Sequence, residues 1–173
     1  MTHPQHPTTQ EYSTTLQPPI LHDPTVACPR WDWFVHETFP SDSVDLAWEI
    51  AAWLMLPFVG IQKSVMLLGE GGNGKSRFLS GITSFLGRRN VSTISLQRLE
   101  ADRFAVSSLV GKLANICPDL PSEHLTGTSV FKAIVGGDCI HAERKYQRGF
   151  DFKPFARLVF SANRPPKSND PTK

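Results

Sequence analysis

The stretch Gly69-Glu70-Gly71-Gly72-Asn73-Gly74-Lys75-Ser76 constrains this 173-residue chain more than any other. It fits the pattern G-x-x-x-x-G-K-[ST], in which backbone N–H groups of a glycine loop surround phosphate oxygens. The apolar run 64–68 before the loop has the length of a buried strand. Residues 77–86 after the loop carry apolar side chains at helical spacing, and Gly87 then provides a stop. Strand, loop and helix in this order predict a nucleotide-binding site.

The chemistry of this loop predicts which residues bind and what they bind. We expect Gly69, Glu70, Gly71, Gly72, Asn73, Gly74, Lys75 and Ser76 to bind ATP through its phosphates. Lys75 is expected to reach the β- and γ-phosphates, and the Ser76 hydroxyl to ligand Mg²⁺. ATP and Mg²⁺ are therefore the expected cofactors. The alternative is an ordinary glycine-rich turn in which the lysine and the serine are incidental.

Composition is that of an ordinary soluble globular protein, with 40% hydrophobic and 20% charged residues. A net charge of +2 is too small to indicate nucleic-acid binding, so any basic surface must be local. Three widely spaced cysteines without a C-x-x-C pair predict neither a zinc site nor disulfides, and they fit a reducing cytoplasm. No signal peptide or membrane span is expected, because the longest apolar passage, 50–61, is too short and contains Pro57 and Gly60.

The chain divides into three parts by its composition. Residues 1–27, rich in Thr, Pro, Gln and His, are expected to form a flexible tail whose histidines are solvated rather than metal-bound. Residues 28–62 are expected to form a helical lead-in. There Ser41-Asp42-Ser43 offers N-cap oxygens to a helix that buries Leu46, Ile50 and Leu54 on one face and ends at Pro57. Its aromatic residues are expected in the core, the alternative being a base-stacking platform. Residues 63–173 hold the glycine loop.

The pattern after the glycine loop predicts the fold class. We expect strands at 90–95, 111–117 and 156–162, a partly helical connection at 96–108, a short helix at 129–135 and a hairpin at 138–152. Strands separated by helical or long connections predict an α/β fold, a parallel sheet with helices on both faces. Ligands of such sheets bind outside the carboxyl ends of the strands. Gly69, Asp119 and Asn163 are expected at those ends.

Two of these residues suit ATP hydrolysis. Asp119 follows the strand at 111–117, and an acid there can hold Mg²⁺ and orient the attacking water. Its alternative role is that of a turn residue between two prolines, and Glu123 is the second candidate acid. Asn163 can hydrogen-bond the γ-phosphate or its water, or it can simply form a turn. Lys75, Asp119 and Asn163 are therefore the expected catalytic residues.

The predicted hairpin carries a basic cluster, which consists of His141, Arg144, Lys145 and Arg148 around Tyr146. Basic side chains with an interleaved aromatic suit single-stranded nucleic acid, because the charges follow phosphates and the ring can stack on a base. A solvated hairpin tip is the alternative.

The ordered set of motifs resembles superfamily-three helicases. It comprises the loop at 69–76, the strand at 112–119, Phe131-Lys132 with Gly136-Gly137-Asp138, Glu143-Arg144-Lys145 and Ser161-Ala162-Asn163-Arg164-Pro165. The likeness is to the helicase domain of phage and plasmid primase–helicase proteins, related to the poxvirus type, and it covers the chain from Cys28 onward. It implies an AAA+-like P-loop ATPase core in a cytoplasmic protein that forms rings, commonly hexamers, and translocates along DNA.

The resemblance also implies roles for single residues. Asp119 matches the Walker B acid, Asn163 matches the sensor-one amide, and the hairpin with His141, Arg144, Lys145 and Arg148 matches the region that contacts single-stranded DNA in the ring channel. Many relatives carry paired acids where Pro118 precedes a single Asp119 here. The family continues past the residue that matches Asp170 into a segment whose Arg-Arg pair supplies the arginine finger, and that segment is not among these 173 residues. We therefore expect a partial core that binds Mg·ATP, hydrolyses it slowly and does not unwind DNA. The alternatives are a P-loop kinase or transferase of small molecules and a nucleotide-gated, non-catalytic DNA-binding module.

Overall fold

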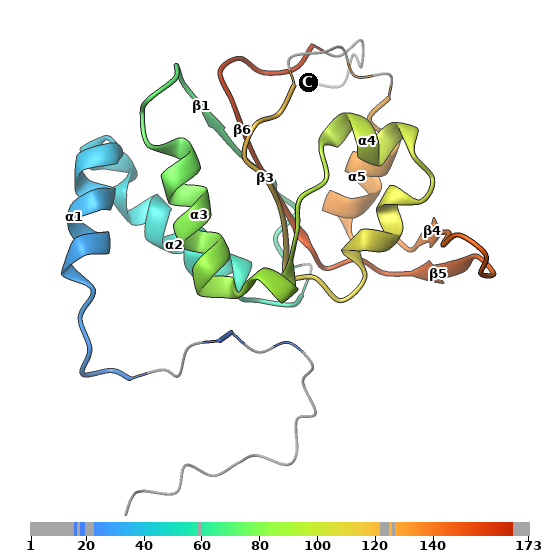
Figure 1. The fold of residues 1–173 in the computed structure, drawn as a ribbon, viewed down its shortest axis with the longest axis horizontal. Coiled ribbons are helices and arrows are strands. Elements are labelled where there is room, and N and C mark those ends of the chain that lie inside the picture. Colours follow the sequence, from blue (N-terminus) through green and yellow to red (C-terminus); the bar gives the residue numbers. More distant parts are fainter. Residues whose placement is uncertain are drawn as a thin grey trace, which may run out of the picture.

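A parallel sheet of four strands lies at the centre of the computed structural model, which describes residues 16, 18–19, 23–58, 60–121, 125 and 127–167 (Figure 1). The strand order is β1-β6-β3-β2. The strands are β1 (Val65–Leu68), β2 (Val91–Ser92), β3 (Ala114–Cys117) and β6 (Arg157–Ala162). In register, Val65 lies opposite Val159, and Ala114 lies opposite Arg157. All of β6 is buried, as expected for a central parallel strand whose apolar run is nearly continuous.

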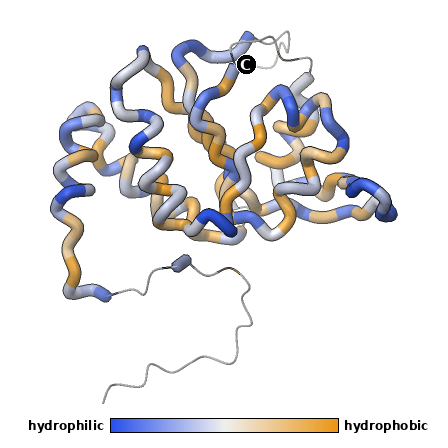
Figure 2. Tube along the Cα trace, in the orientation of Figure 1, coloured by the Kyte–Doolittle hydropathy of each residue, from blue (hydrophilic) through white to orange (hydrophobic). Residues whose placement is uncertain are grey.

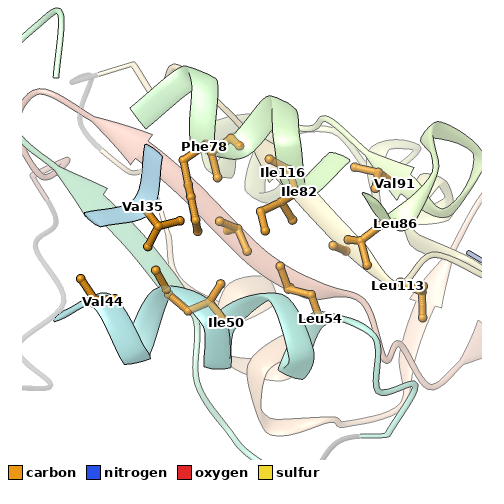
Figure 3. Packing of buried hydrophobic residues seen from close by; sticks show 14 residues of the cluster. Val35, Val44, Ile50, Leu54, Phe78, Ile82, Leu86, Val91, Leu113 and Ile116 are labelled. Carbon is orange, nitrogen blue, oxygen red and sulfur yellow. The ribbon is translucent and has the colours of Figure 1, made fainter. Parts of the chain in front are cut away.

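One face of the sheet is covered by α1 (Pro29–Thr38), α2 (Val44–Leu54) and α3 (Lys75–Leu86). Figure 3 shows how their apolar side chains meet those of the sheet. The lead-in helices are thus part of the main core and not a separate layer, because their buried residues share one cluster with α3 and the strands. That cluster includes Val35, Ile50, Leu54, Phe78, Ile82, Leu86, Ile116 and Val159.

The other face is covered by α4 (Leu96–Ala101), the 3₁₀ turn η3 (Ala105–Leu109) and α5 (Ser129–Gly136). Side chains of β6 alternate between the two faces: Val159 joins the first cluster, whereas Leu158 and Phe160 join the second. Leu99 of α4 and Ile134 of α5 also belong to the second cluster. The predicted parallel α/β fold with helices on both faces is confirmed (Figure 1).

The predicted hairpin is also present. Strands β4 (Ile140–Ala142) and β5 (Phe150–Phe152) pair antiparallel, with Ala142 opposite Phe150. They lie beside α5 and extend away from the central sheet (Figure 1). Figure 2 shows that the tip between them is hydrophilic.

Two predicted strands are shorter than expected: 90–95 is reduced to Val91–Ser92, and 111–117 to Ala114–Cys117. For β2 the reason is the side chain of Asn115. It is fully buried in β3. Its Oδ1 accepts hydrogen bonds from the Ser92 hydroxyl (2.9 Å) and the Ile94 amide (2.8 Å), and its Nδ2 donates to the Ile94 carbonyl (2.8 Å). Beyond Ser92 the chain is therefore held to β3 by a side-chain amide in place of the backbone ladder.

Details of the lead-in differ from expectation. Ser41–Ser43 forms a 3₁₀ turn, η1, and Ser43 makes no side-chain cap to α2; its hydroxyl donates to the Asp42 carboxylate at 3.0 Å instead. Leu46 is 54% exposed, because the buried stripe of α2 runs through Val44, Ala47, Ile50 and Leu54.

No helix in the described part of the chain is long and apolar enough to cross a membrane. The predicted tail, 1–27, falls largely outside the described residues.

Candidate functional site

The glycine loop leaves β1 at Leu68 and enters α3 at Lys75, as its pattern predicts. Gly74 has a left-handed φ of 86°, and a Cβ there would lie 2.6 Å from Cγ2 of Thr38 in the last turn of α1. Gly69 has a φ of 151°, and a side chain there would collide with the amide of Asn73. Both positions therefore require glycine, for conformation and for space.

Lys75 folds back onto the loop that precedes it. Its ammonium donates to the carbonyls of Gly69 (2.6 Å) and Glu70 (2.9 Å) and to Oδ1 of Asn73 (2.8 Å). These contacts match the three donors of a lysine ammonium. The side chain thus ties the start of the loop to its end and places a positive charge at the entrance to α3.

The predicted site residues converge on one cavity of about 460 Å³. It is lined by residues 71–77 of the loop and α3, by Pro118 and Asp119 after β3, and by Ser161, Ala162 and Asn163 at the end of β6. The cavity lies at the carboxyl ends of parallel strands, the usual ligand position in such sheets. Gly69 and Glu70 do not line the cavity; their backbone carbonyls accept hydrogen bonds from the Lys75 ammonium. Glu123, the second candidate acid, lies outside the described residues.

Hydrogen bonds beyond the strand ladder hold the acid and the amide in register. The Leu120 amide donates to the Ser161 carbonyl at 2.8 Å, and the Ser161 hydroxyl donates to the Pro118 carbonyl. The segment with Asp119 is therefore fixed to the segment with Asn163, while both of these side chains remain exposed to solvent.

Four lining residues were not predicted as site residues: Arg77, Pro118, Ser161 and Ala162. Ser161 is buried and acts through the hydrogen bonds just described. Arg77, in the first turn of α3, adds a second cation to the cavity wall. The only sequence signal for Arg77 is its place directly after Ser76, and the glycine-loop pattern does not specify that position.

The donor set of the cavity is poor in acids. Within the described ranges no group of three or more His, Cys, Asp or Glu side chains could hold a metal ion. Mg²⁺ usually keeps several waters and binds through one or two carboxylates plus substrate phosphates. The Ser76 hydroxyl and the Asp119 carboxylate therefore fit a Mg²⁺ ion that arrives with a nucleotide.

The predicted DNA-binding residues lie on the hairpin, away from this cavity. His141, Arg144, Lys145 and Arg148 are all exposed. The Nδ1 atom of His141 lies 2.7 Å from Oδ1 of Asp151 across the hairpin, and the Arg144 guanidinium lies 5.2 Å from the centre of the Phe150 ring. Tyr146 has a φ of 63° and a fully exposed side chain. Lys145 and Tyr146 thus form the outermost part of the tip.

Comparison with known families identifies the chain. The sequence profile of DUF5906, described as a family of unknown function, matches residues 67–173. That range is well over half of the chain. The chain belongs to DUF5906. The match begins within β1 and includes the glycine loop, Asp119, the hairpin and Asn163, so the cavity lies within the DUF5906 region. Among curated proteins none matches this sequence.

Solved structures show what this DUF5906 fold is similar to. An apo structure of the NrS-1 C-terminal region superposes with a TM-score of 0.61 at 15% identity, and the match covers 83% of this chain and 34% of that one. A second apo structure of this region, residues 305–718, superposes with a TM-score of 0.60 at 16% identity, and the match covers 75% of this chain and 32% of that one. A structure of JCV helicase superposes with a TM-score of 0.51 at 16% identity, and the match covers 79% of this chain and 40% of that one. The chain thus spans about a third of the NrS-1 structures, and these likenesses show that its fold is similar to theirs and to that of JCV helicase.

Proposed function

We propose that this chain is the ATP-binding P-loop core of a superfamily-three DNA helicase of the phage or plasmid replication type. Several copies would form a ring, as a hexamer, and couple ATP hydrolysis to translocation along DNA. One observation carries the proposal: the glycine loop, Asp119 and Asn163 share a single cavity at the carboxyl edge of the sheet. The likeness of the fold to JCV helicase supports it.

The predicted site residues that line the cavity each have a role in this proposal. Backbone N–H groups at the start of α3 attract the phosphates, and Lys75 adds a formal charge there. Ser76 and Asp119 hold the Mg²⁺ that ATP brings, and ATP supplies the phosphoryl group that water accepts. Asn163 positions this water, because its amide can donate to a phosphate oxygen and accept from the water at once.

The hairpin is the proposed contact to DNA. Arg144, Lys145 and Arg148 present positive charge around an exposed tyrosine ring at its tip. Backbone phosphates of single-stranded DNA bind such charges, and a base can stack on such a ring. The hairpin lies apart from the cavity, as expected if the two bind different ligands.

Nucleotide titration tests the proposal directly. A fluorescent ATP analogue is titrated in Mg²⁺ against the wild type, Lys75→Ala and Lys63→Ala. Charge-assisted hydrogen bonds contribute about 1.5–3 kcal/mol, so Lys75→Ala should weaken binding by at least about tenfold. Lys63 is the matched control, because it is exposed and precedes β1 at the end opposite the loop. Equal affinity in the wild type and Lys75→Ala, or no binding by the wild type, would refute the proposal.

A further inference from the structure

Helix α4 contacts both the segment that carries Asp119 and the helix that leads into the hairpin. At its first turn, the Gln97 side-chain amide donates to the Pro121 carbonyl at 2.8 Å. Pro121 lies two residues beyond Asp119, on the segment fixed to the end of β6. Leu96 and Leu99 are buried and anchor the helix in the core. Gln97 thus connects one end of α4 to the wall of the nucleotide cavity.

Glu100, at the other end of α4, binds the start of α5. Its Oε1 accepts from the Phe131 amide at 2.8 Å, and its Oε2 accepts from the Val130 amide at 3.3 Å and the Ser129 hydroxyl at 3.5 Å. The first amides of a helix lack partners within the helix, and a negative charge beside them is favourable. One carboxylate from a different helix therefore fixes the position of α5, which leads through Gly136 and Gly137 into β4.

A second contact joins the same region to the hairpin itself. Arg103, two residues after α4, lies with its Nε 3.4 Å from Oε2 of Glu143, the first residue after β4. The hairpin is thus held at its base by Arg103 and, through α5, by Glu100. Gln97, Glu100 and Arg103 lie within seven residues of one another, so a single short segment reaches both proposed ligand sites.

We propose that α4 links the two sites, with Gln97 and Glu100 as positioning residues: the first for the Asp119 segment, the second for α5 and the hairpin. The inference rests on the proposed function, since it needs both a nucleotide and single-stranded DNA to bind. A shift of the Pro121 carbonyl on nucleotide binding moves α4 through Gln97, and α4 then moves the hairpin through Glu100 and Arg103. Nucleotide and DNA therefore change each other's affinity by the same factor, because coupling between sites is reciprocal.

Equilibrium binding of the full chain measures this factor. A labelled single-stranded oligothymidine is titrated by anisotropy with and without a saturating non-hydrolysable Mg·ATP analogue. The wild type should show a ratio of the two Kd values that departs from one by about fivefold or more. Gln97→Ala and Glu100→Gln should bring the ratio to within about twofold of one. The Kd of each variant for either ligand alone should stay within about threefold of the wild-type value, as expected for residues that touch neither ligand.

Arg98→Gln is the matched control, since Arg98 is exposed on the same helix and its ion pair with Asp102 stays within this segment. Its ratio should equal that of the wild type. Arg103→Gln changes an exposed ion pair and cannot unfold the chain through a core defect, so it decides the outcome if Glu100→Gln does not fold. The link is overturned if the wild type binds both ligands but its two Kd values are equal. It is also overturned if Gln97→Ala and Glu100→Gln keep the wild-type ratio of Kd values. In either case the proposed function still stands. Loss of either ligand by the wild type overturns the proposed function itself.

Discussion

Asn73 illustrates how much a single side chain contributes to the glycine loop. The pattern G-x-x-x-x-G-K-[ST] leaves its position unspecified, yet its Oδ1 accepts from the Lys75 ammonium at 2.8 Å. The bond joins the loop just before Gly74 to the lysine just after it. Asn73 therefore helps to hold the loop in the conformation that its glycines permit.

Replacing Asn73 by alanine should weaken ATP binding without loss of fold. Solvent screening reduces the contribution of an exposed charged pair, so this bond should contribute about 1 kcal/mol, as a typical hydrogen bond does. We therefore expect the Kd for Mg·ATP to rise by about fivefold. The same fluorescent titration measures this, with the thermal midpoint as the control for folding. An unchanged Kd would show that the backbone carbonyls of Gly69 and Glu70 suffice to hold Lys75.

Asn115 is the residue on which the edge of the sheet depends. Asn115→Ala should leave the Ser92 hydroxyl and both backbone groups of Ile94 without their partner. Each buried unsatisfied group costs about 1–3 kcal/mol, so the loss of three partners should lower the free energy of unfolding by about 3 kcal/mol or more. Urea unfolding measures the loss. The exposed neighbour Thr93→Ala should change stability by less than about 0.5 kcal/mol.

Cys117 should react differently from the other two cysteines. Burial raises the pKa of the Cys117 thiol, whereas Cys28 and Cys139 are exposed. In the native protein at pH 8 a thiol reagent should modify Cys28 and Cys139 quickly and Cys117 only on unfolding, as peptide mapping can measure. A raised folded-state pKa contributes stability that is fully present below the unfolded thiol pKa, and this stability is lost as the pH rises from that value through the folded-state pKa. Cys117→Ser should therefore flatten the decline of stability above neutral pH.

At the scale of elements, sequence predicts best where one local pattern decides the structure. The strand, loop and helix around residues 69–74 were predicted because glycine conformation and apolar spacing act within a few residues. The hairpin at 138–152 was predicted because alternation flanks a polar tip. Strand β2 was not bounded correctly, because it ends where the side chain of Asn115, 23 residues after Ser92, replaces the ladder. Such long-range partners leave no local signal.

The same limit applies to the candidate site. Asp119 and Asn163 were predicted from the rule that ligands bind at the carboxyl ends of parallel strands, and both line the cavity. Gln97 and Glu100 were not predicted, because their partners lie 24 and about 30 residues away along the chain. Polar residues on a helix surface look alike in sequence, whether they meet solvent or the backbone of another element.

The tip of the hairpin allows a prediction that separates a DNA-binding protein from a small-molecule kinase. Lys145→Ala should weaken single-stranded DNA binding and reduce the slope of log K against log salt by about 0.7, the value for one lost phosphate contact. The affinity for ATP should not change, because Lys145 does not line the cavity. Lys153→Ala, an exposed lysine beyond β5, is the control. A small-molecule kinase would show impaired turnover and no effect on DNA.

At the scale of the molecule, the lead-in and the sheet share one hydrophobic core. The Trp31 indole stacks on Phe78 of α3 with ring centres 5.6 Å apart, and Phe39 meets the same ring edge-on at 4.9 Å. Gly81 lets the indole approach, since a Cβ at that position would collide with Trp31. Composition separates residues 28–62 from the rest of the chain, but packing joins them to the helix that begins at the glycine loop.

This unity predicts a single cooperative unfolding transition. All four tryptophans lie in the lead-in, so their fluorescence reports on the lead-in and on its contact with α3, whereas far-UV circular dichroism reports on the whole chain. The two probes should give the same urea midpoint, the standard test of two-state behaviour. A ligand at about 100 times its Kd adds about 2.7 kcal/mol, so Mg·ATP should shift both midpoints together. Gly81→Val forces Trp31 away from α3 and should separate the two urea midpoints, with the fluorescence midpoint at the lower urea concentration. Separate midpoints in the wild type would mean that the lead-in folds apart from the nucleotide site.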